Sequence, residues 1–347
     1  MWWGDRSLVE GRIPEMNILD ANIMGGMHLV ILGAGASIAS CLRNPEFHGK
    51  QLPSMNGLSD VIDLSDILSQ VPQNLLCNNF EELYGNIYEW DKSFPLLEEI
   101  NNRIYTYFSD LKLPIEPTIY DYLIMSLRDK DVIATFNWDP FLYQAWWRNY
   151  LHGSTPQLIF LHGNVAIGYN EEIGGIGWAG TIGKRYKKYY TPTQLMFPIK
   201  HKNYKDNRFI NGEWKKLNNC LKEAQKVTIF GYSAPKSDVE AISAMQSAWG
   251  SPFKRNMEQF EFIDIRSEQE IIDSWSSFIH SHHYDYCTDF FQSSLAQYPR
   301  RTFEAHMLKI YPSTPEEYFV EPLPIPHNEI HSFEEMWAWY EPLIAKE

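Results

Sequence analysis

The sequence predicts an α/β protein built on a doubly wound, Rossmann-like parallel sheet. Short apolar runs, each suited to a buried strand, alternate with longer segments whose apolar residues recur at helical spacing. Such alternation is typical of a parallel sheet whose strands are joined by helices. The predicted strands are residues 28–32, 131–137, 158–162, 226–232 and 260–265.

Helical segments fill the intervals between these strands. Asp139 and Pro140 predict the N-cap and first turn of a helix that runs through Trp147. Pro114 and Pro117 interrupt an earlier helical pattern, so we expect a new helix after them. The other predicted helices are residues 60–71, 78–92, 94–110, 118–129, 212–225 and 238–249.

The chain divides into a core and its additions. We expect residues 1–26 to be a leader before the first strand and residues 27–267 to form one ligand-binding domain. This domain contains a helical insertion at about 40–130 and a long excursion, rich in glycine, tyrosine and lysine, at about 163–210. The tail, residues 268–347, is aromatic and predicted to be mostly helical.

The composition excludes several classes of protein. A formal net charge of -14 over 347 residues argues against a nucleic-acid binder with a broad basic face. No run is long enough to span a membrane, and the first residues lack the apolar core of a secretion signal. The four cysteines are far apart and form no C-x-x-C pair, which predicts a cytoplasmic protein without a structural zinc module. They are Cys41, Cys77, Cys220 and Cys287.

A glycine turn follows the first predicted strand. Gly33 and Gly35 leave no Cβ between the backbone and a ligand, and the segment after them can begin a helix. The N–H groups and the positive end of a helix N-terminus favour a phosphate group. The alternative is a tight strand-to-helix turn without a ligand, because Ile38 stands where a dinucleotide fingerprint would have a third glycine.

Polar residues or glycine lie at the carboxyl end of every predicted strand. In a doubly wound sheet, ligands bind outside the carboxyl ends of the strands, so these residues are expected to surround one site. They are Gly33–Ser37, Asn137–Asp139, His162–Gly163, Gly231–Ser233 and Asp264.

Four of these segments, in this order, resemble the motifs of the sirtuin superfamily. They read GAGAS at 33–37, TFNWD at 135–139, LHG at 161–163 and GYS at 231–233. The resemblance covers roughly residues 27–265. The chain departs from the protein deacylases of that superfamily because it lacks the four cysteines of their zinc ribbon. It therefore resembles the zinc-free bacterial SIR2-like group, whose members hydrolyse NAD and often act in anti-phage defence.

The resemblance implies hydrolysis of the bond between nicotinamide and ribose in NAD, giving nicotinamide and ADP-ribose. Nicotinamide leaves NAD as a neutral base, so no acid is needed to protonate it. Asn137 would bind the nicotinamide ribose or orient water, and His162 would be the general base. Asp139 would hold the nicotinamide carboxamide. The expected NAD-binding residues are Gly33, Ala34, Gly35 and Ser37 at the pyrophosphate, Gly231 and Ser233 at a phosphate or ribose, and Asp264 at the adenine ribose.

Several of these residues also have a purely structural alternative. Asp139 can be a helix N-cap, His162 a hydrogen-bonded core histidine and Asp264 a turn residue. A second LHG, at 151–153, contains His152. No predicted strand precedes it, so we interpret it as a helix end with Gly153 as the C-cap.

Two further clusters are open to a functional interpretation. The spacing of His280, His282, His283 and Cys287 fits no metal pattern, so we expect a packed or solvated helix there. The excursion mixes tyrosines with cations, which could follow a nucleic acid, but we favour a flexible lid over the site. Its cations are Lys184, Arg185, Lys187, Lys188, Lys200, Lys202 and Lys205.

Two other functions remain as alternatives to the hydrolase. One is a non-catalytic sensor that binds NAD or ADP-ribose and regulates a partner. The other is a sirtuin-type protein deacylase, which the missing zinc cysteines disfavour. As partners we expect NAD and either further copies of the chain or another protein of an anti-phage system, and neither nucleic acid nor a membrane.

Overall fold

The computed structural model describes residues 26–42, 52–183, 185–199, 204–234, 238–251, 259–279, 284–310 and 321–347. Its centre is a six-stranded sheet in which every neighbouring pair is parallel. The order β3-β2-β1-β7-β8-β9 is that of a doubly wound Rossmann-like sheet, so the predicted fold class is confirmed. The strands are β1 (Met27–Leu32), β2 (Val132–Thr135), β3 (Gln157–Phe160), β7 (Ala224–Phe230), β8 (Gln259–Ile263) and β9 (Tyr284–Cys287).

Strand β1 lies at the centre of this sheet. Leu29 pairs with Val132 of β2 on one side and with Val227 of β7 on the other. All three side chains are buried, as expected for strands whose two faces are both covered. The chain order reverses between β1 and β7, and this switch point is where such sheets bind ligands.

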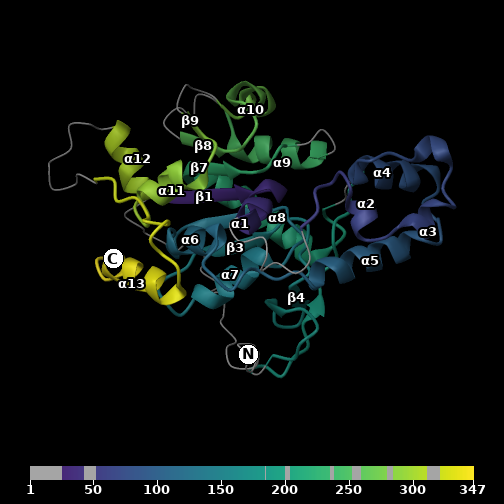
Figure 1. Ribbon diagram of the computed structural model, residues 1–347, viewed down its shortest axis with the longest axis horizontal. Coiled ribbons are helices and arrows are strands. Elements are labelled where there is room, and N and C mark those ends of the chain that lie inside the picture. The colour runs from purple at the N-terminus through teal and green to yellow at the C-terminus, as the bar shows by residue number, and fades with distance from the viewer. Residues whose placement is uncertain are drawn as a thin grey trace.

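Helices connect and cover these strands (Figure 1). Helix α1 begins directly after β1, and α7 begins shortly after β2. Helix α8 contacts β1 and β3 and packs on α9. These helices are α1 (Ala34–Leu42), α6 (Ile119–Met125), α7 (Phe141–Asn149), α8 (Arg208–Glu223) and α9 (Val239–Trp249).

The helical insertion stands to one side of the sheet in Figure 1. Its helices bury a set of apolar side chains, which includes Leu58, Phe80 and Ile104. The segment predicted as one helix over 60–71 forms two short helices, because Asp63 between them has a left-handed φ of 52°. The insertion contains α2 (Leu58–Val61), α3 (Ser65–Leu68), η2 (Gln73–Leu75), α4 (Phe80–Trp90) and α5 (Leu97–Ser109).

The predicted irregular excursion contains a small antiparallel sheet. Its strands are β4 (Ile167–Asn170), β5 (Gly175–Trp178) and β6 (Thr191–Pro192), in the order β5-β4-β6. Gly168 and Gly177 are required here because a Cβ on either would lie 2.6–2.8 Å from Tyr190. Glycine content led to the prediction of a loop, but these glycines lie within strands, where they allow Tyr190 to pack closely. Lys184, Lys200 and Lys202 lie outside the described residues.

The described tail is mostly helical, as predicted, but it also contains a strand, β9, that was not predicted. Tyr284–Cys287 forms the edge strand of the main sheet, parallel to β8, so Cys287 lies in a strand rather than a helix. The run YDYC alternates polar and aromatic residues and therefore lacks a buried strand's apolar pattern. His280, His282, His283 and the leader up to residue 25 lie outside the described residues.

The rest of the tail packs against the core. Tyr340 in α13 is fully buried and its hydroxyl lies 2.9 Å from the Ser126 hydroxyl, just after α6. No helix in the described part of the chain is long and apolar enough to span a membrane. The remaining elements are α10 (Glu268–Trp275), η4 (Phe290–Gln292), α11 (Ser294–Gln297), α12 (Thr302–Ile310) and α13 (Phe333–Ile344).

Candidate functional site

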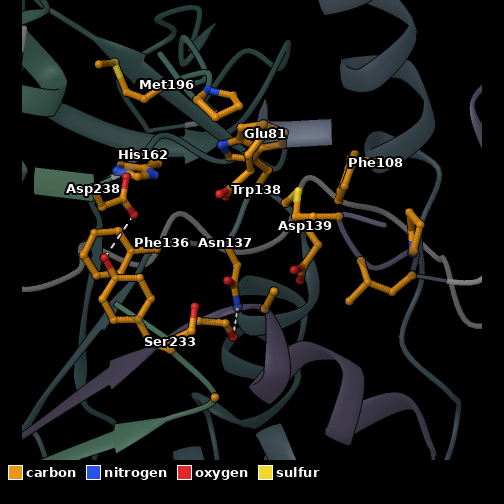
Figure 2. Close-up of a pocket in the computed structure, with 18 of the residues that line it drawn as sticks. Glu81, Phe108, Phe136, Asn137, Trp138, Asp139, His162, Met196, Ser233 and Asp238 are labelled. Carbon is orange, nitrogen blue, oxygen red and sulfur yellow. Dashed lines mark hydrogen bonds between the residues drawn. The ribbon is translucent and has the colours of Figure 1, made fainter. Parts of the chain in front are cut away.

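A cavity of about 320 Å³ lies at the carboxyl ends of β1, β2, β3 and β7, at the switch point of the sheet (Figure 2). Its floor comes from the turns that follow these strands, and the helical insertion adds part of the wall. The lining residues are Gly33, Ala34, Leu52, Pro53, Met55, Asn79, Glu81, Phe108, Phe136, Asn137, Trp138, Asp139, His162, Met196, Pro198, Gly231, Tyr232, Ser233 and Asp238.

Two glycine turns pack backbone against backbone below this cavity. A Cβ on Gly33 would lie 2.5 Å from the Gly231 carbonyl oxygen, and one on Gly35 would lie 2.8 Å from the Gly231 Cα. The N–H groups of Gly33, Gly35 and Ala36 donate to the carbonyls of Phe230, Gly231 and Gly33. This close packing explains why both positions are glycine. Because three N–H groups are already bonded within the turns, fewer of them point to a ligand than the sequence predicted.

Asn137 follows β2 and reaches back across the sheet to the first glycine turn. Its amide nitrogen donates to the Gly33 carbonyl at 2.8 Å, to Ser37 Oγ at 2.9 Å and to Tyr120 Oη at 3.3 Å. A carbonyl can only accept, so the nitrogen of the amide must be the atom that faces Gly33. The amide oxygen accepts no hydrogen bond from the described residues and is available to a ligand in the cavity.

The Asp139 carboxylate is almost fully buried in the same wall. Burial raises its pKa to about 6, although the Ser37 hydroxyl and the backbone N–H of Phe141 partly offset this by donating to it. The bond from Phe141 N, at 3.1 Å, supports the first turn of α7. The N-cap of α7 is Pro140, so the predicted cap at Asp139 is one residue too early; Asp139 instead accepts from Phe141 N just before the helix and also lines the cavity.

His162 follows β3 and is buried in the cavity wall. The edge of its ring packs on Phe136, with centroids 4.9 Å apart, and its Nε2 lies 3.5 Å from the Tyr204 hydroxyl. The other LHG histidine, His152, lies outside the cavity and stacks on Trp337 with ring centroids 3.5 Å apart. The two identical tripeptides thus have different environments, as predicted, but the helix before His152 ends at Asn149 with Tyr150 as its C-cap, so the predicted cap at Gly153 was wrong.

The structure does not bring every predicted residue into the cavity wall. Gly231, with a φ of 61°, and the exposed Ser233 line it. Ser37 is fully buried beneath it, with its hydroxyl 2.7 Å from that of Tyr120. Gly35 lies outside the wall, and Asp264 forms an ion pair with Arg266 at 2.8 Å.

Several lining residues were not predicted from the sequence. Glu81 comes from α4 of the insertion, and Asp238 accepts a hydrogen bond from the Tyr232 hydroxyl at 3.0 Å. Phe136 lies within the TFNWD motif, so its position next to Asn137 could have indicated it. Glu81 carries no such signal because only the tertiary fold brings α4 to the sheet.

Fold and site together define a doubly wound, Rossmann-like α/β protein with a cavity at the switch point of its sheet. No protein-family model matches the chain, and no curated protein matches it. Among solved structures, it is similar to a Sir2 protein with a peptide and NAD+ at 15% identity, over 78% of this chain and 90% of that one, with a TM-score of 0.35.

Another similar structure is Sir2 bound to acetylated peptide, at 15% identity and a TM-score of 0.35, over 77% of this chain and 90% of that one. A Sir2 enzyme described for its mechanism and regulation is 11% identical, over 74% and 90% of the two chains, again with a TM-score of 0.35. Similarity at this level assigns no family, so the function is inferred from the motifs and the cavity. Within the described residues, no group of three or more His, Cys, Asp or Glu is placed to hold a metal ion.

Proposed function

We propose that the protein is an NAD+ hydrolase that releases nicotinamide and ADP-ribose. The observation that carries the proposal is the meeting of three motif residues in one cavity: Asn137 with an available acceptor oxygen, His162 and the buried carboxylate of Asp139. They come from the ends of two strands and converge at the switch point (Figure 2).

The size of the cavity indicates which part of NAD+ enters it. About 320 Å³ is at the lower end of the range for small-molecule sites, about 300–1,000 Å³, so the cavity fits one half of a dinucleotide. Its acidic lining suits the cationic nicotinamide end. The pyrophosphate would then lie outside, over Ala34 and the N-terminus of α1, where the helix dipole favours negative charge.

The residues can then perform hydrolysis in the following way. The positive charge moves from the nicotinamide ring to the ribose as the bond breaks, and the buried Asp139 carboxylate stabilises it throughout. The Asn137 oxygen accepts a hydrogen bond from a ribose hydroxyl or from the attacking water. His162 takes a proton from that water and passes it to solvent, so water and NAD+ give ADP-ribose, nicotinamide and one proton.

The biological setting that we propose is NAD depletion in the cytoplasm during bacterial anti-phage defence. The ordered motifs and the lack of zinc-ribbon cysteines support this setting, with further copies of the chain or a second protein as partner. The non-catalytic sensor is the main alternative, since the same cavity can bind NAD+ without cleaving it.

The test is incubation of the purified protein with NAD+, with the products separated by chromatography. His162→Asn removes the proposed base, and His152→Asn is its matched control in the other LHG tripeptide. We expect His162→Asn to lower nicotinamide release by roughly 10²–10⁴-fold, and His152→Asn to retain it. Acetyl-lysine peptide in a parallel reaction tests for deacylation.

Asn137→Ala gives a second, independent variant for this test. It removes the acceptor oxygen but also three hydrogen bonds to the scaffold, so its melting temperature must be measured beside its activity. Full turnover in both His162→Asn and folded Asn137→Ala would contradict the mechanism. NAD+ binding by all forms with no nicotinamide release by any would support the sensor.

A further inference from the structure

The charges that line the cavity all have one sign among the described residues. Glu81, Asp139 and Asp238 line it, and none of the described lining residues is lysine or arginine. Figure 2 shows the carboxylates of Asp139 and Asp238 on opposite sides of Asn137. A site with this composition favours a cation over a neutral or negative group.

Aromatic rings form another part of the wall. Phe108 packs its edge on Trp138, with centroids 5.9 Å apart, and Phe136 stacks on Tyr232 with centroids 4.1 Å apart. Aromatic faces attract cations through their quadrupole and also suit a flat ring. Carboxylates and aromatic faces together therefore favour a cationic heteroaromatic ring.

Two of the carboxylates act on the same phenol at the cavity wall. Asp238 accepts the Tyr232 hydroxyl at 3.0 Å. The pKa of Tyr232 is raised well above its usual value, first by burial, then by Asp238, with a smaller contribution from Glu81. Both carboxylates therefore add negative charge to this part of the cavity wall.

Glu81 reaches the site from outside the sheet. It lies in the first turn of α4, two residues after the N-cap Asn79, which accepts a hydrogen bond from Glu82 N at 3.2 Å. Capping fixes the start of α4, and thereby the direction in which Glu81 projects. The insertion therefore contributes charge to the site, besides covering it.

We propose that the cavity is a subsite for a cationic aromatic ring and that Glu81 and Asp238 determine its preference for the cation. The identity of that ring as nicotinamide in NAD+ rests on the function proposed above. Cleavage converts the ring from a cation to a neutral base, so the site loses its attraction for the product as the product forms. Nicotinamide is therefore released readily, and N-alkylated pyridinium ions bind as inhibitors.

The experiment compares two probes that differ in charge but share the ring and carboxamide. Calorimetric titration of the full chain with 1-methylnicotinamide, a cation, and with neutral nicotinamide gives their dissociation constants. We expect the cation to bind at least about tenfold more tightly. Glu81→Gln and Asp238→Asn should each reduce this ratio several-fold, while the adjacent and exposed Glu82→Gln should leave it unchanged.

Two outcomes would overturn the proposal: equal affinity for the two probes, or a ratio that Glu81→Gln and Asp238→Asn leave as in the wild type. These outcomes are separate from the fate of the hydrolase. Selective binding of 1-methylnicotinamide without cleavage of NAD+ would keep the subsite and reject the hydrolase. Cleavage of NAD+ by a protein that binds both probes equally would support the hydrolase and reject the cation subsite.

Discussion

Asp139→Asn should make the protein more stable while it lowers activity. The carboxylate is almost fully buried, and its pKa is raised from 3.8 to about 6 by that burial. A shift of about two units corresponds to ~3 kcal/mol of destabilisation when the carboxylate is ionised. Asparagine keeps an oxygen that can accept from Phe141 N, so the start of α7 is preserved.

The sign of this effect follows from proton binding. The folded protein holds the Asp139 proton to a higher pH than the unfolded chain, so its free energy of unfolding falls as the pH rises from about 4 to about 6. Asp139→Asn removes this dependence. Its gain over the wild type should be about 3 kcal/mol at pH 7.5 and roughly half of that at pH 5.

Denaturant unfolding at these two pH values measures the gain, and chromatography of the NAD+ reaction measures turnover. Asp129→Asn, at an exposed position in the turn before β2, is the control and should change neither. If Asp139→Asn is no more stable than the wild type at pH 7.5, or is stabilised equally at both pH values, then the ionised Asp139 carboxylate does not destabilise the folded protein as inferred. Retained turnover would remove Asp139 from the mechanism.

Three further predictions concern the scaffold and the metal content. Tyr120→Phe removes one hydroxyl that helps to orient the Asn137 amide, so nicotinamide release should fall about fivefold at unchanged KM, with ~1 kcal/mol lost in the free energy of unfolding. Turnover equal to wild type would show that this hydroxyl does not position Asn137. Gly33→Ala should lower the melting temperature sharply because its Cβ would meet the Gly231 carbonyl, whereas Gly212→Ala, in an open helical position, should be neutral or stabilising. Elemental analysis should find no stoichiometric zinc, and one zinc per chain would reopen the deacylase alternative.

The main sheet could be predicted because five of its six strands are short apolar runs with helices between them. The observed strands end before the polar residues that follow, so Asn137 and His162 lie in turns at the carboxyl edge. There the ordered motifs indicated them correctly as neighbours in one cavity. Parallel topology makes this possible, since it brings the ends of distant strands to one edge.

The rest of the site depends on tertiary packing that has no local pattern. Glu81 is one of two adjacent glutamates in an amphipathic helix, and nothing in the sequence distinguishes it from the exposed Glu82. Asp264, expected at the adenine ribose, lies outside the cavity wall and pairs with Arg266, and its contact with a ligand stays a prediction. The edge strand β9 was missed because solvent-facing polar residues replace the apolar run.

The central position of β1 has a consequence for how the chain folds during synthesis. Leu29 pairs with Val132 and with Val227, so the two neighbours of β1 are made about 100 and about 200 residues after it. At roughly 5–20 residues per second, one side of this apolar strand waits roughly 10–40 s on the ribosome for its partner. Pairings this distant in sequence also fold slowly once the chain is complete. Recombinant yield should therefore depend on what protects β1 during that interval, and co-expressed chaperones or slower growth should raise it.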